Sequence, residues 1–180
     1  MTINLPDGIE ALIAHGPHPD HASALMLFGQ FVGSWDVDVT WYENGAPARR
    51  ARGEWHFFWV LEGRAIQDVW IVPPRSERTL GGADCYEYGT TLRFYDPGLG
   101  AWRSTWHGPM KQTVIPFVAK QVGDEIVLSG RHADGRSMRW IFSEIKPESF
   151  RWRSEVLDDA AELWDLAQEF TVRRSDAVYL

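Results

Sequence analysis

Apolar and polar residues alternate from Trp35 to Trp41, directly after Gly33 and Ser34. A period of two is typical of a β-strand with one buried face. The same alternation recurs along the chain and predicts strands at about residues 33–42, 52–61, 64–72, 90–95, 101–107, 112–121, 125–131, 137–145, 150–157 and 161–174. In the last of these strands we expect one shared face for Trp164, Leu166, Phe170 and Val172.

Turn signals separate the predicted strands and indicate how the strands are connected. Asn44-Gly45 favours a type I′ hairpin turn, and most other connections are equally short. Strands joined by hairpins form an antiparallel meander. An open sheet of this length would expose its edges and its apolar face, so we expect closure. The prediction is an all-β antiparallel barrel of eight to ten strands.

The segment before the barrel and one long connection depart from this pattern. Residues 1–19 contain several helix breakers and are expected to be a flexible leader, followed by one barrel domain over residues 20–180. Asp20 is placed to cap a short helix over residues 21–30. Residues 73–89 form a connection long enough to suggest a lid or a binding loop that gates the barrel mouth.

The composition excludes several classes of function. The chain has 180 residues and a net charge of −7, which argues against nucleic acid and anionic membranes as partners. The single cysteine, Cys85, excludes an internal disulfide. The N-terminus lacks the pattern of a signal peptide, and no apolar run has the ~18 residues of a spanning helix. We therefore expect a cytoplasmic protein.

Short motifs resemble those of a known group of barrels. Phe31-Val32-Gly33-Ser34-Trp35 is similar to the Gly-x-Trp opening of the calycin superfamily, the lipocalin-like barrels. Trp55-His-Phe57, Leu61-Glu-Gly63-Arg64 and Asp68-x-Trp70 resemble a family of uncharacterised bacterial lipocalin-like proteins. The resemblance implies a lipocalin-like fold in which Trp35 closes one end of the barrel, with an arginine packed across it. Arg174 falls on the same predicted strand face as Phe170 and Val172, which suits it to that role. The second motif of the secreted lipocalins is missing.

The chain contains ten tryptophans, which give either a packed core or an aromatic cavity. Polar residues on the apolar strand faces are candidates for orienting a ligand. Arg64 is predicted on the same strand face as Asp68 and could pair with it. The candidate ligand-binding residues are Trp35, Trp55, Trp59, Arg64, Asp68, Trp70, Trp106, Trp140 and Gln168. The alternative for the polar residues is a buried structural pair.

Evidence for catalysis or a metal is weaker. Asp68 and His107 are the candidate acid–base residues. However, the alternation of side chains places His107 and His56 on the outer face of their predicted strands. His15, His18 and His21 have a spacing that suggests a metal site, but the glycine and prolines between them prevent a helix. We expect no metal and no cofactor. Haem is disfavoured because no histidine follows His132.

Other chemical groups have simpler explanations. Asp36 and Asp38 fit a solvated strand face better than a pair of glycosidase carboxylates. Nothing near Cys85 in the sequence indicates a reactive thiol.

Three hypotheses of function follow. The first is binding of a small, mostly apolar or aromatic molecule inside the barrel. The second is an isomerase or lyase acting on a small aromatic or conjugated substrate in the same cavity. The third is a homodimeric structural module without a ligand.

Overall fold

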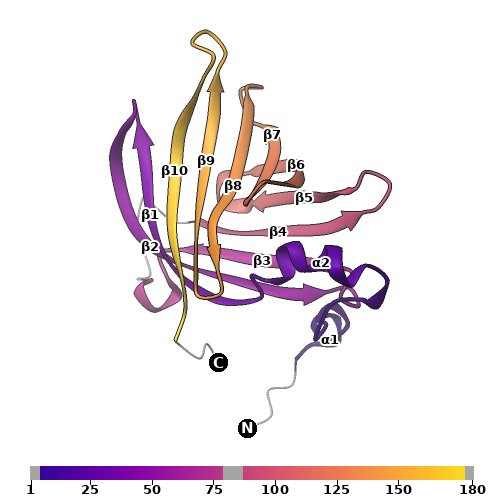
Figure 1. Ribbon diagram of the computed structural model, residues 1–180. Helices are drawn as coiled ribbons and strands as arrows, with labels where there is room; N and C mark the ends of the chain where they lie inside the picture. Colours follow the sequence, from indigo (N-terminus) through magenta and orange to yellow (C-terminus); the bar gives the residue numbers. More distant parts are fainter. Residues whose placement is uncertain (1–4, 79–86, 177–180) are drawn as a thin grey trace.

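The computed structural model describes residues 5–78 and 87–176. Within these ranges ten antiparallel strands form one closed barrel (Figure 1). The strands are β1 (Gly33–Glu43), β2 (Ala46–Val60), β3 (Ala65–Val72), β4 (Glu87–Asp96), β5 (Ala101–Gly108), β6 (Thr113–Val122), β7 (Glu125–Arg131), β8 (Ser137–Lys146), β9 (Ser149–Asp158) and β10 (Leu163–Arg174). The helical elements are α1 (Asp7–Leu12), η1 (Pro19–His21), α2 (Ala22–Gly29), η2 (Arg75–Glu77) and η3 (Pro109–Lys111).

Each strand pairs with its neighbours in the sequence, and β1 pairs with β10 to close the barrel. This arrangement confirms the predicted all-β, lipocalin-like antiparallel barrel with a short N-terminal helix. The largest difference in strand bounds is in β2, which begins at Ala46 and not near residue 52. It begins there because Asn44 and Gly45 both have positive φ, 51° and 75°, and turn the chain directly into the next strand. None of the described helices is long and apolar enough to cross a membrane.

The N-terminal segment is attached to the β2–β3 hairpin. Residues 7–12 of the expected leader form α1. After it, the amide of Ala14 donates to the carbonyl of Trp59 over 2.9 Å, and the amide of His18 donates to the carbonyl of Gly63 over 3.0 Å. These bonds satisfy backbone groups at the end of the hairpin.

A β-bulge in β10 changes which residues face the barrel interior. The pairing with β9 shifts between Leu166 and Gln168, so Ala167 is an extra residue on β10. One inserted residue reverses the alternation of side chains. The prediction that Trp164 shares a face with Phe170 is therefore wrong. Trp164 instead packs on the outer surface under Arg139, whose guanidinium carbon lies 4.0 Å from the centroid of the indole.

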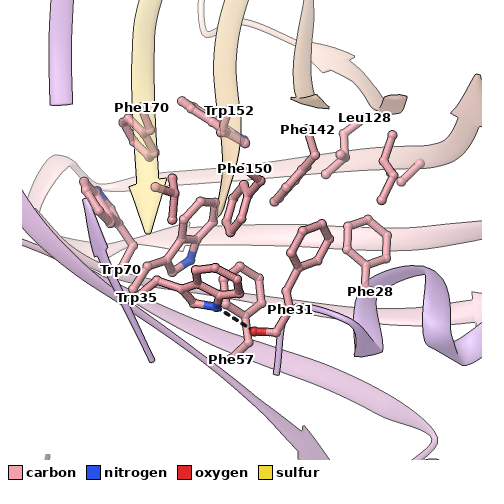
Figure 2. Packing of buried hydrophobic residues seen from close by; sticks show 14 of the residues in the cluster. Phe28, Phe31, Trp35, Phe57, Trp70, Leu128, Phe142, Phe150, Trp152 and Phe170 are labelled. Carbon is pink, nitrogen blue, oxygen red and sulfur yellow. Dashed lines mark hydrogen bonds between the residues drawn. The ribbon is translucent and has the colours of Figure 1, made fainter. Parts of the chain in front are cut away.

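Aromatic side chains fill the end of the barrel beside α2. Phe28, near the end of this helix, and Phe31, two residues beyond it, point into the barrel (Figure 2). Both are buried, and the ring centroid of Phe31 lies 5.0 Å from that of Phe142 and 4.8 Å from that of Phe150. Figure 1 shows α2 beside β3 and β4, away from the tip of the β9–β10 hairpin. We call this end the closed end.

Trp35 lies at the closed end between the helix and the last strand. Its indole nitrogen donates to the carbonyl of Phe31 over 2.7 Å (Figure 2). The guanidinium carbon of Arg174 lies 3.8 Å from the indole centroid on the other side. Gly33 has φ of 128°, and a Cβ there would lie 2.6 Å from Nη1 of Arg174. The positive φ, which residues with a Cβ rarely adopt, explains physically why a glycine stands two residues before the tryptophan.

Phe31→Ala should reduce the free energy of unfolding by about 3–5 kcal/mol, because its ring fills space that the strands leave empty. The change is measured by urea unfolding followed by far-UV circular dichroism. Val114→Thr is the matched control, since Val114 lies in β6 and is 64% exposed. Equal stability of the two variants would contradict the role given to the phenylalanine.

Candidate functional site

A cavity of about 370 Å³ occupies the barrel end opposite α2. We call this space the aromatic cavity. Its walls come from the ends of the strands nearest the β9–β10 turn, together with η3. The rings that line it are those of Trp55, Trp70, Trp106, Trp140, Trp152 and Phe170. Trp41 adds a further indole.

The aromatic walls are held by ring-to-ring contacts. Phe170 stacks between two indoles, with centroids 4.3 Å from Trp152 and 4.6 Å from Trp70. Trp55 stands almost perpendicular to Trp152, at 88° and 6.3 Å. Offset and edge-to-face arrangements are the favoured geometries of aromatic pairs. The cavity is therefore bounded by rings that hold each other in place before any ligand binds.

The structure separates the predicted binding residues into two groups. Trp55, Trp70, Trp106, Trp140 and Gln168 line the aromatic cavity. Trp35 and Trp59 do not; both are buried at the closed end, where Trp59 packs against Gly29 of α2.

Many residues that line the cavity are outside the predicted set, and Trp41, Trp152 and Phe170 are among them. Trp152 lies in the alternation Phe150-x-Trp152-x-Ser154, which was a signal available in the sequence.

Asp68 is fully buried below the cavity and forms an ion pair. Its Oδ2 lies 2.5 Å from Nη2 of Arg93, and its Oδ1 accepts from the amide of Thr91 over 3.2 Å. Arg93 is equally buried, and its guanidinium carbon lies 4.9 Å from the ring centroid of Phe28. The carboxylate does not line the cavity. It fits the structural alternative considered for this residue better than the acid–base role.

The predicted pairing of Arg64 with Asp68 is wrong. Arg64 is exposed, and its Nη1 lies 3.3 Å from Oδ2 of Asp20. The reason is local: Arg64 belongs to the turn that precedes β3, where Leu61, Glu62 and Gly63 all have positive φ. The alternation of side chains between the two faces holds within a strand and does not extend through such a turn. Arg64 therefore lies outside the barrel and does not line the aromatic cavity.

Both strand histidines lie on the outer face. His107 is exposed, so it is not placed for acid–base chemistry in the cavity. His56 is half-buried, and its ring nitrogens lie 2.9 Å from Oγ of Ser34 and 3.1 Å from Oε2 of Glu54. Burial lowers the pKa of His56 more than the carboxylate of Glu54 raises it. Burial raises the pKa of Glu54, but hydrogen bonds from Arg75 and His56 outweigh it and leave the pKa below its ordinary value.

Acidic and basic side chains gather at the cavity mouth. The indole nitrogen of Trp70 donates to Oε2 of Glu87 over 2.9 Å, and the other carboxylate oxygen pairs with Lys111. His132 also lines the cavity and pairs with Asp134 at 2.9 Å. Residues 79–86 of the long connection, including Cys85, lie outside the described residues. The predicted gate is therefore not described.

A comparison with solved structures finds the same fold. The S-type phycobiliprotein lyase CPES from Guillardia theta is similar, with a TM-score of 0.56 and 12% identity. The match covers 85% of this chain and 93% of the lyase. No protein-family model matches the chain, and no curated protein matches it. The barrel therefore has a calycin-like fold, and at this identity the likeness extends to the fold alone.

Asp68→Asn should lower the free energy of unfolding by about 3–5 kcal/mol, because it leaves the buried Arg93 guanidinium without its counter-charge. Asp38→Asn, which removes an exposed pair with Arg173, should cost less than about 1 kcal/mol. Urea unfolding measures both changes. If Asp68→Asn kept full stability and abolished ligand binding, the carboxylate would belong to the site and not to the barrel framework.

The His56 imidazole should titrate below its ordinary value of 6.5 in the folded protein. The unfolded chain then takes up this proton first as the pH falls, so this contribution to stability is present above pH 6.5 and lost below it. NMR titration of the histidine ring protons gives the midpoint. The folding free energy of His56→Gln should depend less on pH between 7 and 5, a range set by the ordinary histidine pKa of about 6.5. A midpoint above 6.5 would show that Glu54 outweighs burial.

Proposed function

We propose that this protein binds a small, mostly apolar or aromatic molecule in the aromatic cavity. The observation that carries the proposal is the cavity itself, about 370 Å³ in volume and lined by stacked and edge-on aromatic rings. This volume lies within the range of about 300–1,000 Å³ that is usual for ligand pockets. A homodimeric structural module without a ligand gains nothing from such a space, since an unfilled apolar cavity costs stability.

The rings favour a flat ligand over a globular one. Trp152 and Trp70 cover the faces of Phe170, so a further ring can make offset or edge-on contact with the outer sides of the two indoles. Each contact of this kind contributes about 0.5–1.5 kcal/mol beyond the burial of area. An aromatic or conjugated molecule would therefore bind more tightly than an aliphatic chain of equal surface.

Binding is favoured over catalysis in this cavity. The similar structure belongs to a protein named as a lyase, which supports a barrel of this kind as a site for chemistry in that protein. In this chain the two acid–base candidates, Asp68 and His107, are not among the lining residues. The described carboxylate that does line the cavity, Glu87, is already bonded to Trp70 and Lys111. An isomerase or lyase activity has less support than ligand binding.

The remaining expectations from the sequence stay predictions. They are a homodimer, a cytoplasmic location and membership of the bacterial lipocalin-like family. None of them is needed for the ligand-binding proposal, which depends on the aromatic cavity within one chain.

Titration with fatty acids, phenolics and other aromatic compounds should give saturable quenching of tryptophan fluorescence by aromatic members. Ala167→Phe should weaken the binding of any such compound at least ~10-fold, because its ring would enter the cavity that Ala167 lines. Ala48→Phe is the matched control, since Ala48 is exposed on β2. Absence of saturable binding across the library, or equal effects of the two variants, would contradict the proposal.

A further inference from the structure

Three buried donors at the aromatic cavity have no acceptor among the described residues. They are the indole nitrogens of Trp55 and Trp152 and the amide nitrogen of Gln168. The two indoles are 5% and 4% exposed, so bulk water does not solvate them freely. A buried donor without an acceptor costs about 1–3 kcal/mol, and such groups are rare in native proteins. Three at one cavity therefore require a common explanation.

Two of the donors belong to adjoining strands, and the third comes from across the barrel. Trp152 lies on β9 opposite Phe170 of β10, and Gln168 lies two residues before that phenylalanine. Trp55 comes from β2 across the barrel, with its ring 6.3 Å from that of Trp152. Gln168 follows the bulge, so it alternates in register with Phe170 and lies on the interior face, opposite Ser154. The barrel thus brings three side chains with an unpartnered N–H group into the lining of one cavity.

The indole of Trp70 shows that an unpaired N–H is not a general property of these walls. Its nitrogen donates to Oε2 of Glu87 over 2.9 Å at the mouth. The indole nitrogen of Trp35 likewise donates to the carbonyl of Phe31 at the closed end. Buried donors without a described partner also occur elsewhere, as on Arg93 and Ser104. Those of Trp55, Trp152 and Gln168 differ in that their side chains line a cavity, where a ligand can bring the acceptor.

The charges of the lining favour a neutral acceptor. An indole and a primary amide donate hydrogen bonds but carry no charge. The described lining contains Lys111 and His132 as its basic residues, and these pair with Glu87 and Asp134. A carboxylate buried among neutral groups would keep most of its desolvation cost. A ketone or quinone oxygen accepts hydrogen bonds at a much lower cost.

We propose that the ligand is a flat conjugated molecule with a neutral carbonyl oxygen, which accepts hydrogen bonds from Trp55, Trp152 and Gln168. This inference rests on the proposed function and specifies the class of ligand. The rings select the planar body of the molecule, and the three donors select its oxygen. A hydrocarbon of the same shape would leave the donors unpaired and would bind more weakly.

The test uses 9-fluorenone and fluorene, which have the same ring framework. Carbon 9 is a carbonyl in fluorenone and a methylene in fluorene. Isothermal titration calorimetry avoids any dependence on the fluorescence of the substituted tryptophans. Fluorenone should bind the wild-type protein at least ~10-fold more tightly than fluorene, since each neutral hydrogen bond is worth about 3- to 10-fold in affinity. Fluorene-9-carboxylate should bind more weakly than fluorenone, because it brings a charge into the cavity.

The variants Trp152→Phe and Gln168→Met remove a donor and keep an apolar side chain of related shape. Each should weaken fluorenone about 3- to 10-fold and change fluorene less than ~2-fold. Trp70→Phe is the matched control: it also removes an indole from the cavity wall, but its N–H is already bonded to Glu87. It should change the affinities for the two probes by the same factor.

Equal affinities for fluorenone and fluorene, or equal losses for both in Trp152→Phe, would overturn the inference and leave the proposed function standing. Tighter binding of the carboxylate than of fluorenone would also overturn it, since the acceptor would then be an anion. Failure of both neutral probes to bind would overturn it as well. The proposed function itself would fail only if the wider aromatic library also gave no saturable binding.

Discussion

The structure depends on how the interior of a ten-stranded barrel is filled. Side chains from the strands alone do not occupy a barrel of this width along its whole length. At one end Phe28 and Phe31 enter from α2 and complete an aromatic core with Phe142 and Phe150. At the other end the described helical element is the single turn η3, and the aromatic cavity lies there. The contact of Trp35 with Phe31 and Arg174 holds the filled end together.

Strand order and strand faces could be predicted because both are local properties. An alternation such as Trp35 to Trp41 and a turn such as Asn44-Gly45 each express their structure over a few residues. The two errors occur where local rules stop. Ala167 adds a residue to β10 and reverses the alternation before it, and the three positive φ values after Val60 place Arg64 outside the barrel. Neither a bulge nor a turn of this kind has a strong signal in alternation alone.

The site was predicted in part for a related reason. Parity tells which face of a strand a side chain occupies but not how far along the barrel axis it lies. Trp35, Trp55 and Trp59 are all predicted on buried faces and are all buried, yet of these three only Trp55 lines the aromatic cavity. Likewise, Asp68 points inward and lies directly opposite Thr91 of the neighbouring strand. Its ion-pair partner is Arg93, two residues further along that strand. Position along the axis depends on strand tilt and closure, which follow from all ten strands together.

The division of the barrel into a filled end and a hollow end is tested most directly by a crystal structure of the ligand-free protein under xenon pressure. Xenon binds in apolar cavities and avoids well-packed cores. We expect xenon density in the space bounded by Trp55, Trp140 and Trp152, and none among the rings of Phe28, Phe31 and Phe142. Indoles packed together with no space for xenon between them, or xenon bound beneath α2, would contradict the account.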